Sequence, residues 1–265
     1  MIPNILSIAG SDPSGGAGIQ ADIKSMSANG GYAMAAITAL TAQNTRGVQA
    51  VQLLTPDIIT AQITAIRDDI RIDAVKIGML GNAAIIGAVA DALADVNAPI
   101  VLDPVMVAKG GDRLLAAEAV DALRRLLLPM AALITPNLPE IADLLGCKEA
   151  RDTGEMAEHA ERLMDLGARA VLLKGGHLDG PDSPDLLMWS GGTEWLHSAR
   201  IDSPNTHGTG CTLSSAIAAH LGAGLTLLDA VQRGKLYVTG AIADAHRLSV
   251  GHGHGPTHHF HLWQR

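Results

Sequence analysis

Short apolar runs alternate with amphipathic stretches along most of the chain. Runs typical of buried strands occur at residues 4–9, 34–40, 48–54, 74–77, 100–102, 132–135 and 170–173. Stretches with helical composition lie between them, at residues 19–28, from residue 55 onward, and near 81–95, 114–127, 137–145 and 153–166. This alternation predicts an α/β protein with a mainly parallel sheet covered by helices on both faces.

The pattern changes after Lys174. Residues 186–190 and 193–197 flank a Gly-Gly pair, which predicts a hairpin and therefore antiparallel strands at an edge of the sheet. Two further helices are expected near residues 209–222 and 226–246. No polar linker interrupts these elements, so we expect one domain over residues 1–265. Because open α/β sheets bind ligands at the carboxyl ends of their strands, the loops after the strands should carry the functional residues.

Composition narrows the classes of protein that this chain can belong to. The 265 residues are 48% hydrophobic and 17% charged, which is enough apolar sequence for a sizeable core. A net charge of −8 and an aromatic content of 2% make nucleic acid and anionic membranes poor partners. Two cysteines fit neither a disulfide scaffold nor a zinc site, and no signal peptide or membrane-spanning stretch is evident. These features predict a cytoplasmic protein.

Residues 205–212, Asn-Thr-His-Gly-Thr-Gly-Cys-Thr, stand where a long helix is predicted to begin. Gly208, Thr209 and Gly210 let the backbone approach a ligand, and free N–H groups at a helix start favour an anion such as phosphate. Cys211 falls in the first turn, where the positive helix end lowers a thiol pKa, so it is a candidate base or nucleophile. The alternative is an inert buried cysteine, which is how we interpret Cys147.

Oxygen-bearing side chains follow two other predicted strands. Asp103 ends one strand, and Asn137 and Glu140 follow the next. Carboxylate and amide oxygens, together with water and phosphate, suit Mg²⁺. Asn137 and Glu140 also have the spacing of a helix cap, and the two roles are compatible. Lys174 ends a further strand, where its ammonium group would suit a phosphate.

Two features have ordinary interpretations. The glycine-rich loop at residues 10–18 matches neither the dinucleotide-binding motif nor the P-loop. Composition alone favours a turn residue for Asp12 and a solvated helix residue for Asp22, which flank this loop. Five of the 11 histidines lie in the Gly/His-rich segment 251–261. A flexible tail or a subunit contact explains them as well as a metal would, so no metal is assigned to them.

Seven motifs together carry a resemblance to a known family. They are AGSDPSGGAGIQAD at 9–22, TAQNT at 41–45, KIGML at 76–80, LDPVM at 102–106, TPNLPE at 135–140, KGGH at 174–177 and HGTGCT at 207–212. The chain closely resembles the hydroxymethylpyrimidine/phosphomethylpyrimidine kinases of thiamine biosynthesis, collinearly from residue 5 to the histidine-rich segment. This implies a ribokinase-like fold, usually a homodimer, in which ATP and Mg²⁺ meet a small-molecule alcohol.

The resemblance also implies an activity. The substrate 4-amino-5-hydroxymethyl-2-methylpyrimidine would be phosphorylated on its alcohol, and the monophosphate would then be phosphorylated to the diphosphate. The Gly-Thr-Gly turn would form the anion hole, and Cys211 would stand where aspartate is the usual base of the superfamily. The alternatives are a pyridoxal kinase of the same superfamily and a catalytically silent pyrimidine-binding sensor. The sensor would need neither the Gly-Thr-Gly-Cys turn nor Asn137 and Glu140.

Site residues follow from the same resemblance. The aminopyrimidine would hydrogen-bond Gln43, in a pocket lined by Asp22, Met79, Val105 and the Gly10 backbone. ATP would contact Lys174, Asn137, Thr209 and Lys235. Mg²⁺ and the phosphates would be organised by Asp103, Asn137 and Glu140.

Overall fold

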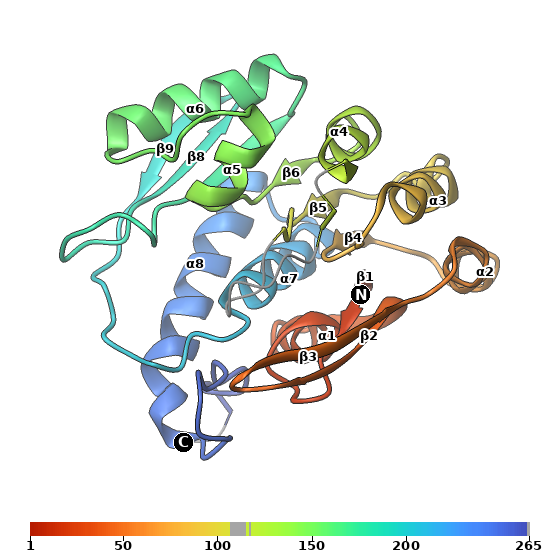
Figure 1. Ribbon diagram of the computed structural model, residues 1–265, viewed down its shortest axis with the longest axis horizontal. Helices are drawn as coiled ribbons and strands as arrows, with labels where there is room; N and C mark the ends of the chain where they lie inside the picture. The colour runs from red at the N-terminus through yellow and green to blue at the C-terminus, as the bar shows by residue number, and fades with distance from the viewer. Residues whose placement is uncertain (107–114, 117, 264–265) are drawn as a thin grey trace.

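The computed structural model describes residues 1–106, 115–116 and 118–263, and its centre is a nine-stranded sheet (Figure 1). The strands are β1 (Asn4–Ser11), β2 (Tyr32–Asn44), β3 (Gly47–Leu53), β4 (Ala74–Ile77), β5 (Ile100–Leu102), β6 (Leu133–Ile134), β7 (Ala170–Lys174), β8 (Asp185–Trp189) and β9 (Gly192–Leu196). Their order is β3-β2-β1-β4-β5-β6-β7-β8-β9. The pairs from β2 to β7 are parallel, whereas β3, β8 and β9 pair antiparallel at the two edges. The predicted mainly parallel sheet with antiparallel edges is therefore confirmed.

Helices cover both faces of the sheet. They are α1 (Gly18–Ala28), α2 (Pro56–Arg67), α3 (Ala83–Leu93), α4 (Ala119–Ala122) with the π-helical η1 (Leu123–Leu127), α5 (Leu138–Leu145), α6 (Thr153–Asp165), α7 (Thr209–Gly222), α8 (Leu227–Ala243) and the 3₁₀ turn η2 (Asp244–Arg247). Figure 1 shows α1, α7 and α8 on one face and α2 to α6 on the other. The predicted helix at 114–127 lies partly outside the described residues, and its remainder is α4 with η1. No helix in the described part of the chain is long and apolar enough to cross a membrane.

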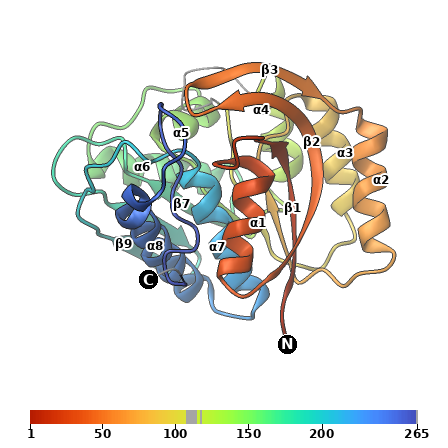
Figure 2. The same ribbon diagram turned by 90° about the horizontal axis from the view of Figure 1, so that it is seen from below.

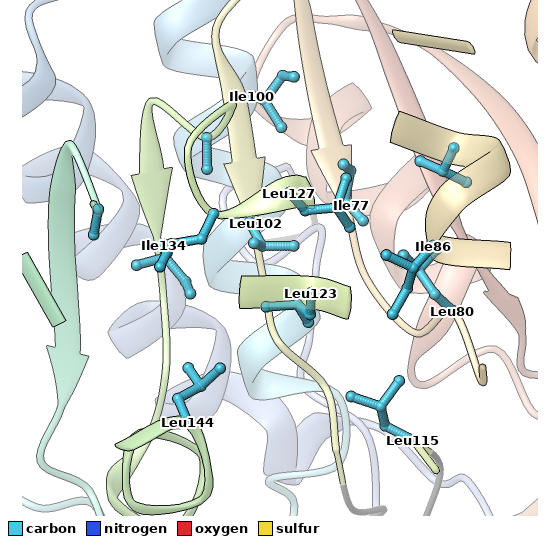
Figure 3. Close-up of a cluster of buried hydrophobic side chains, with 14 of the residues drawn as sticks. Ile77, Leu80, Ile86, Ile100, Leu102, Leu115, Leu123, Leu127, Ile134 and Leu144 are labelled. Carbon is cyan, nitrogen blue, oxygen red and sulfur yellow. The ribbon is translucent and has the colours of Figure 1, made fainter. Parts of the chain in front are cut away.

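Alternating side chains of the central strands build two separate cores. In β4, Val75 and Ile77 join the core beneath α2 to α6, while Ala74 points to the core beneath α7 and α8. Figure 3 shows the larger core, in which Ile77 and Leu102 of neighbouring strands meet side chains of α3 and η1. Lys76 shares the face of Ala74 but lies at the end of the strand, where a charged group is fully buried. The alternation of side chains along β4 therefore buries one lysine near the carboxyl end of this strand.

Two segments differ from the sequence-based expectation. β2 extends to Asn44, beyond the predicted 34–40, because it continues as a hairpin with β3 that pairs Asn44 with Gly47. The C-terminal segment is not a flexible tail: it runs beside α8 (Figure 2). His258 and His259 are buried there, and the Tyr237 hydroxyl donates to the His259 carbonyl at 2.8 Å. Burial lowers the pKa of His259 to about 3, so this ring is neutral.

Candidate active site

A cavity of about 1600 Å³ opens at the carboxyl ends of the parallel strands. The sheet order reverses at β1, whose neighbours β2 and β4 follow on opposite sides, and such a switch point leaves a crevice between the loops. The cavity is lined by all predicted site residues except one: Gly10, Gln43, Met79, Asp103, Val105, Asn137, Glu140, Lys174, Gly208, Thr209, Gly210, Cys211 and Lys235. The exception is Asp22. Segments far apart in the sequence therefore meet at one place.

The start of α7 presents free backbone donors to this cavity. Gly208 caps the helix with φ of 77°, and a Cβ there would lie 1.8 Å from the Gly16 carbonyl oxygen, so only glycine fits. Thr209 and Thr212 donate their N–H groups to Thr206 and Gly208. The N–H groups of Gly210 and Cys211 find no acceptor among the described residues. Free N–H groups at the positive end of a helix dipole are the donors that an anion such as phosphate accepts from.

The thiol of Cys211 does not have the lowered pKa that its helix position predicts. Burial, together with the nearby carboxylates of Asp22 and Asp103, raises its pKa to about 11. Lys76 and the Gly18 N–H, which donates a hydrogen bond to the sulfur, oppose the rise without cancelling it. The expectation of a lowered thiol pKa is therefore wrong, because desolvation outweighs the helix end.

Asp22 lies beneath the cavity, not in its lining. Its carboxylate accepts hydrogen bonds from Lys76 Nζ at 2.8 and 2.9 Å, from Ser7 at 2.6 Å and from Ser215 at 2.8 Å. Both charged side chains are fully buried. Neither the solvated helix residue nor the pocket-lining residue expected at this position is observed. Sequence reasoning also missed Lys76, whose only signal was a lysine in an otherwise apolar strand.

Lys174 sits between the two carboxylates predicted to organise a metal ion. Its Nζ lies 3.2 Å from Asp103 Oδ1 and 3.8 Å from Glu140 Oε2. Burial and the Asp103 charge raise the pKa of Glu140 to about 7, although Lys174 opposes this. Asp103 remains ionised because Lys174 and Lys76 outweigh its burial and lower its pKa. The described residues contain no group of three carboxylate, His or Cys side chains placed to hold a metal ion, but the oxygens of Asp103 and Glu140 are of the type that a divalent cation binds together with water and phosphate.

Asn137 and Lys235 line the cavity, and some of their polar atoms already form hydrogen bonds within the protein. Asn137 Oδ1 accepts from the Glu140 N–H at 2.8 Å, and Glu140 Oε2 accepts from the Asn137 N–H at 2.8 Å, which confirms the predicted cap. The Asn137 side-chain NH₂ donates to none of the described residues. Lys235 Nζ donates to Asp185 at 2.7 Å and to the Ser183 carbonyl at 2.9 Å. Both residues therefore lie at the end of the cavity around Lys174.

The opposite end of the cavity contains Gln43, Met79 and the Gly10 backbone. Met79 Sδ packs against Gly10: a Cβ added to Gly10 would lie 3.4 Å from this sulfur. The Met79 carbonyl accepts a hydrogen bond from the Thr38 hydroxyl at 2.6 Å. Asp12, expected as a simple turn residue, is buried and bonded to His207 at 2.8 Å. The amide of Gln43 lies 3.4 Å from the same His207 nitrogen. One end of the cavity thus suits a small polar ring, and the other suits phosphates.

Cys147 has more contacts than a simple inert residue. Its sulfur lies 3.5 Å from His159 Nε2, and it lines the cavity beside Lys148. Burial lowers the pKa of His159, so its ring is neutral near pH 7.

The fold and the site define a kinase with a ribokinase-like architecture: a sheet with helices on both faces, a free helix start and a lysine–carboxylate cluster at one cavity. The sequence model described as phosphomethylpyrimidine kinase matches residues 12–258. The chain belongs to the phosphomethylpyrimidine kinase family. It is 52% identical to the hydroxymethylpyrimidine/phosphomethylpyrimidine kinase of Escherichia coli (strain K12), over 98% of each chain. The corresponding kinase of Rhizobium meliloti (strain 1021) is also 52% identical, over 97% of each chain.

Solved structures agree with this assignment. An ADP complex of Bacillus subtilis pyridoxal kinase superimposes with a TM-score of 0.92 at 38% identity, covering 100% of both chains. Phosphomethylpyrimidine kinase from Clostridium difficile 630 gives a TM-score of 0.80 at 44% identity, covering 91% of this chain and 100% of that chain. The protein is therefore a kinase of this fold, and kinases of this kind use ATP.

Proposed function

We propose that the protein transfers phosphate from ATP to the alcohol of 4-amino-5-hydroxymethyl-2-methylpyrimidine, and then to the resulting monophosphate. One observation carries the proposal: a single cavity joins Gln43 at one end to Lys174 at the other, with the free helix start between them. The names of the relatives in E. coli and R. meliloti support the substrate. We further propose that one domain, residues 1–265, carries out both steps at this one site.

Gln43 is the group that we expect to read the ring. A primary amide offers one acceptor and one donor side by side, which matches an amino group next to a ring nitrogen. Gly10, Met79 and Val105 would enclose the ring, since all three line the same cavity as Gln43. Asp22 would act on this pocket only through Lys76, which lines the cavity.

The phosphates of ATP would lie against the start of α7 and Lys174. The free N–H groups of Gly210 and Cys211, together with Thr209, would bind phosphate oxygens, and the side-chain NH₂ of Asn137 would add a further donor. Lys235, held by Asp185, would reinforce the positive potential nearby. Asp103 and Glu140 would hold Mg²⁺, which neutralises phosphate charge when bound.

Cys211 would orient the substrate alcohol in this mechanism. Because its pKa is about 11, the thiol is protonated at neutral pH and cannot serve as a preformed base. Phosphoryl transfer depends mainly on positioning and charge stabilisation, so proton removal from the alcohol need not precede it.

The wider setting follows from the same proposal. We propose a cytoplasmic homodimer that binds small molecules and neither nucleic acid nor membrane, in line with the acidic composition. A second activity, phosphorylation of pyridoxal, is favoured by one observation: the superposition on pyridoxal kinase covers the whole chain. The silent-sensor alternative is disfavoured because the cavity retains both the free helix start and the lysine–carboxylate cluster.

The proposal is tested by incubating the purified protein and Mg²⁺-ATP separately with the pyrimidine alcohol, its purified monophosphate and pyridoxal. Products are identified by mass spectrometry and phosphorus NMR, with a Lys174→Ala variant as the matched control for contaminating kinases. We expect the monophosphate from the alcohol and the diphosphate from the monophosphate. Phosphorylation of pyridoxal with no product from the pyrimidine would overturn the proposal.

A further inference from the structure

Three polar residues from distant parts of the chain meet at the ring-binding end of the cavity. Asp12 follows β1, Gln43 is the last residue but one of β2, and His207 precedes α7. His207 Nε2 lies 2.8 Å from Asp12 Oδ2 and 3.4 Å from the terminal nitrogen of Gln43. His207 is fixed in place, because its N–H donates to the Gly255 carbonyl at 3.0 Å and its ring packs on the Gly16 backbone. This histidine has no role in the function proposed above.

The carboxylate of Asp12 determines which ring nitrogen of His207 carries a hydrogen. Asp12 Oδ1 accepts from the N–H and hydroxyl of Ser14 at 2.9 and 2.7 Å, and Oδ2 accepts from the Ala17 N–H at 2.8 Å. Burial favours the protonated acid, but the hydrogen bonds from His207 and Ser14 outweigh it and hold the pKa of Asp12 below its ordinary value. An ionised carboxylate can only accept, so Nε2 of His207 must be the donor.

A protonated Nε2 in turn determines the orientation of the Gln43 amide. As placed, the amide nitrogen faces His207, and the amide oxygen lies 3.3 Å from the Thr41 hydroxyl. A half-turn about the last side-chain bond exchanges these two atoms at almost no steric cost. Two N–H groups cannot bond each other, whereas a carbonyl oxygen there would share the single Nε2 hydrogen with Asp12, as the longer arm of a bifurcated hydrogen bond. The Thr41 hydroxyl already donates to the Ser11 carbonyl at 2.9 Å, so its lone pairs favour the NH₂ group on that side.

We propose that the Asp12–His207 pair is a specificity determinant that holds the Gln43 amide with its oxygen toward His207 and its NH₂ toward Thr41. The outer edge of the amide then offers one acceptor and one donor to the cavity, in a fixed order. This order selects rings with an amino group on the His207 side and an unprotonated ring nitrogen on the Thr41 side. The inference rests on the proposed function, and it makes His207 a positioning residue that acts through Gln43.

The decisive experiment is a double-mutant cycle on substrate specificity. The variants are His207→Leu, His207→Gln, Gln43→Leu and His207→Leu with Gln43→Leu, each assayed for kcat/KM on the aminopyrimidine alcohol and on pyridoxal, with KM for ATP. We expect His207→Leu to lower kcat/KM for the aminopyrimidine about five- to tenfold, the loss typical of one hydrogen bond. His207→Gln restores a donor and should recover most of that loss. In the Gln43→Leu background, His207→Leu should add less than about twofold.

The inference fails if the fold-losses in kcat/KM of the two single variants multiply in the double variant, or if His207→Leu lowers kcat/KM equally on both substrates. Either result would mean that His207 only supports the fold. Nitrogen-15 NMR of the histidine rings in the unsubstituted protein gives an independent reading, with the His207 signal assigned by its absence from His207→Gln. We expect a hydrogen on Nε2; a bare Nε2 overturns the argument. If the unsubstituted protein phosphorylates no aminopyrimidine, the proposed function fails instead, while calorimetric affinities of the same variants and the NMR result still decide the role of His207.

Discussion

Lys76→Met tests whether the buried ion pair beneath the cavity governs the stability of this region. The substitution keeps a long unbranched side chain but removes the ammonium that donates to both Asp22 oxygens, at 2.8 and 2.9 Å. Removing one member of a buried pair typically costs about 3–5 kcal/mol, because the other charge is left without a counter-ion. Ser7 and Ser215 still donate to Asp22, so we expect a loss near the lower end, about 3 kcal/mol.

The assay is urea unfolding at pH 7, followed by circular dichroism and analysed by linear extrapolation. Lys76→Met combined with Asp22→Asn removes both charges and should recover at least half of the lost free energy of unfolding. Arg71→Met is the matched surface control, since its pair with Asp73 is solvent-exposed, and it should change stability little. A loss below about 1 kcal/mol in Lys76→Met, or a double variant no more stable than the single one, would refute the reasoning.

Four further predictions concern ligand binding, the reaction and the pH dependence of stability. Gln43→Leu should weaken pyrimidine binding by about 1–3 kcal/mol per unpaired group and leave ATP affinity unchanged; calorimetry with each ligand checks this, and a loss confined to ATP would contradict it. Cys211→Ala should slow phosphorylation of the alcohol more than that of the monophosphate, because the thiol is proposed to orient the alcohol and the monophosphate presents a phosphate oxygen in its place; separate assays of the two steps decide. Lys174→Ala should slow both steps, because its charge acts on the transferred phosphate; a loss in one step alone would contradict this. Because the folded-state pKa of Cys211 is about 11 against an ordinary 9.0, stability should fall as pH rises from about 9 toward about 11, and the pH–rate profile should show no thiol ionisation below pH 9.

The sequence predicted the elements of this fold well because periodicity depends on local burial. The parallel strands, the hairpin of β8 and β9 and the α5 cap all appear where alternation and capping residues place them. The length of β2 was not predictable, since residues up to Asn44 are extended only because β3 pairs with them. The packing of the C-terminal segment was likewise not predictable, because it depends on contacts with residues far from it in the sequence, such as the hydrogen bond from Tyr237.

The site was predictable in position but less so in electrostatics. Residues at strand ends meet as expected, because parallel strands bring their carboxyl ends to one edge. The pairing of Asp22 with Lys76 joins positions 54 residues apart, and no local pattern signals it. The pKa of Cys211 shows the same limit: the helix start was visible in the sequence, whereas the burial that outweighs it was not.

The way the C-terminal segment closes on earlier loops has a consequence during synthesis. The N–H groups of Gly253 and His254 donate to Thr45 at the tip of the β2–β3 hairpin, and Gly255 accepts from His207. Asp12, near the start of the chain, meets its partner 195 residues later. A nascent chain can therefore pair β1, β2 and β4 early, but the ring-binding end of the cavity stays incomplete until residues 253–255 have emerged from the ribosome. Ligand binding therefore requires residues 253–255, and a chain stalled before residue 250 would carry the strands of the sheet without a competent site.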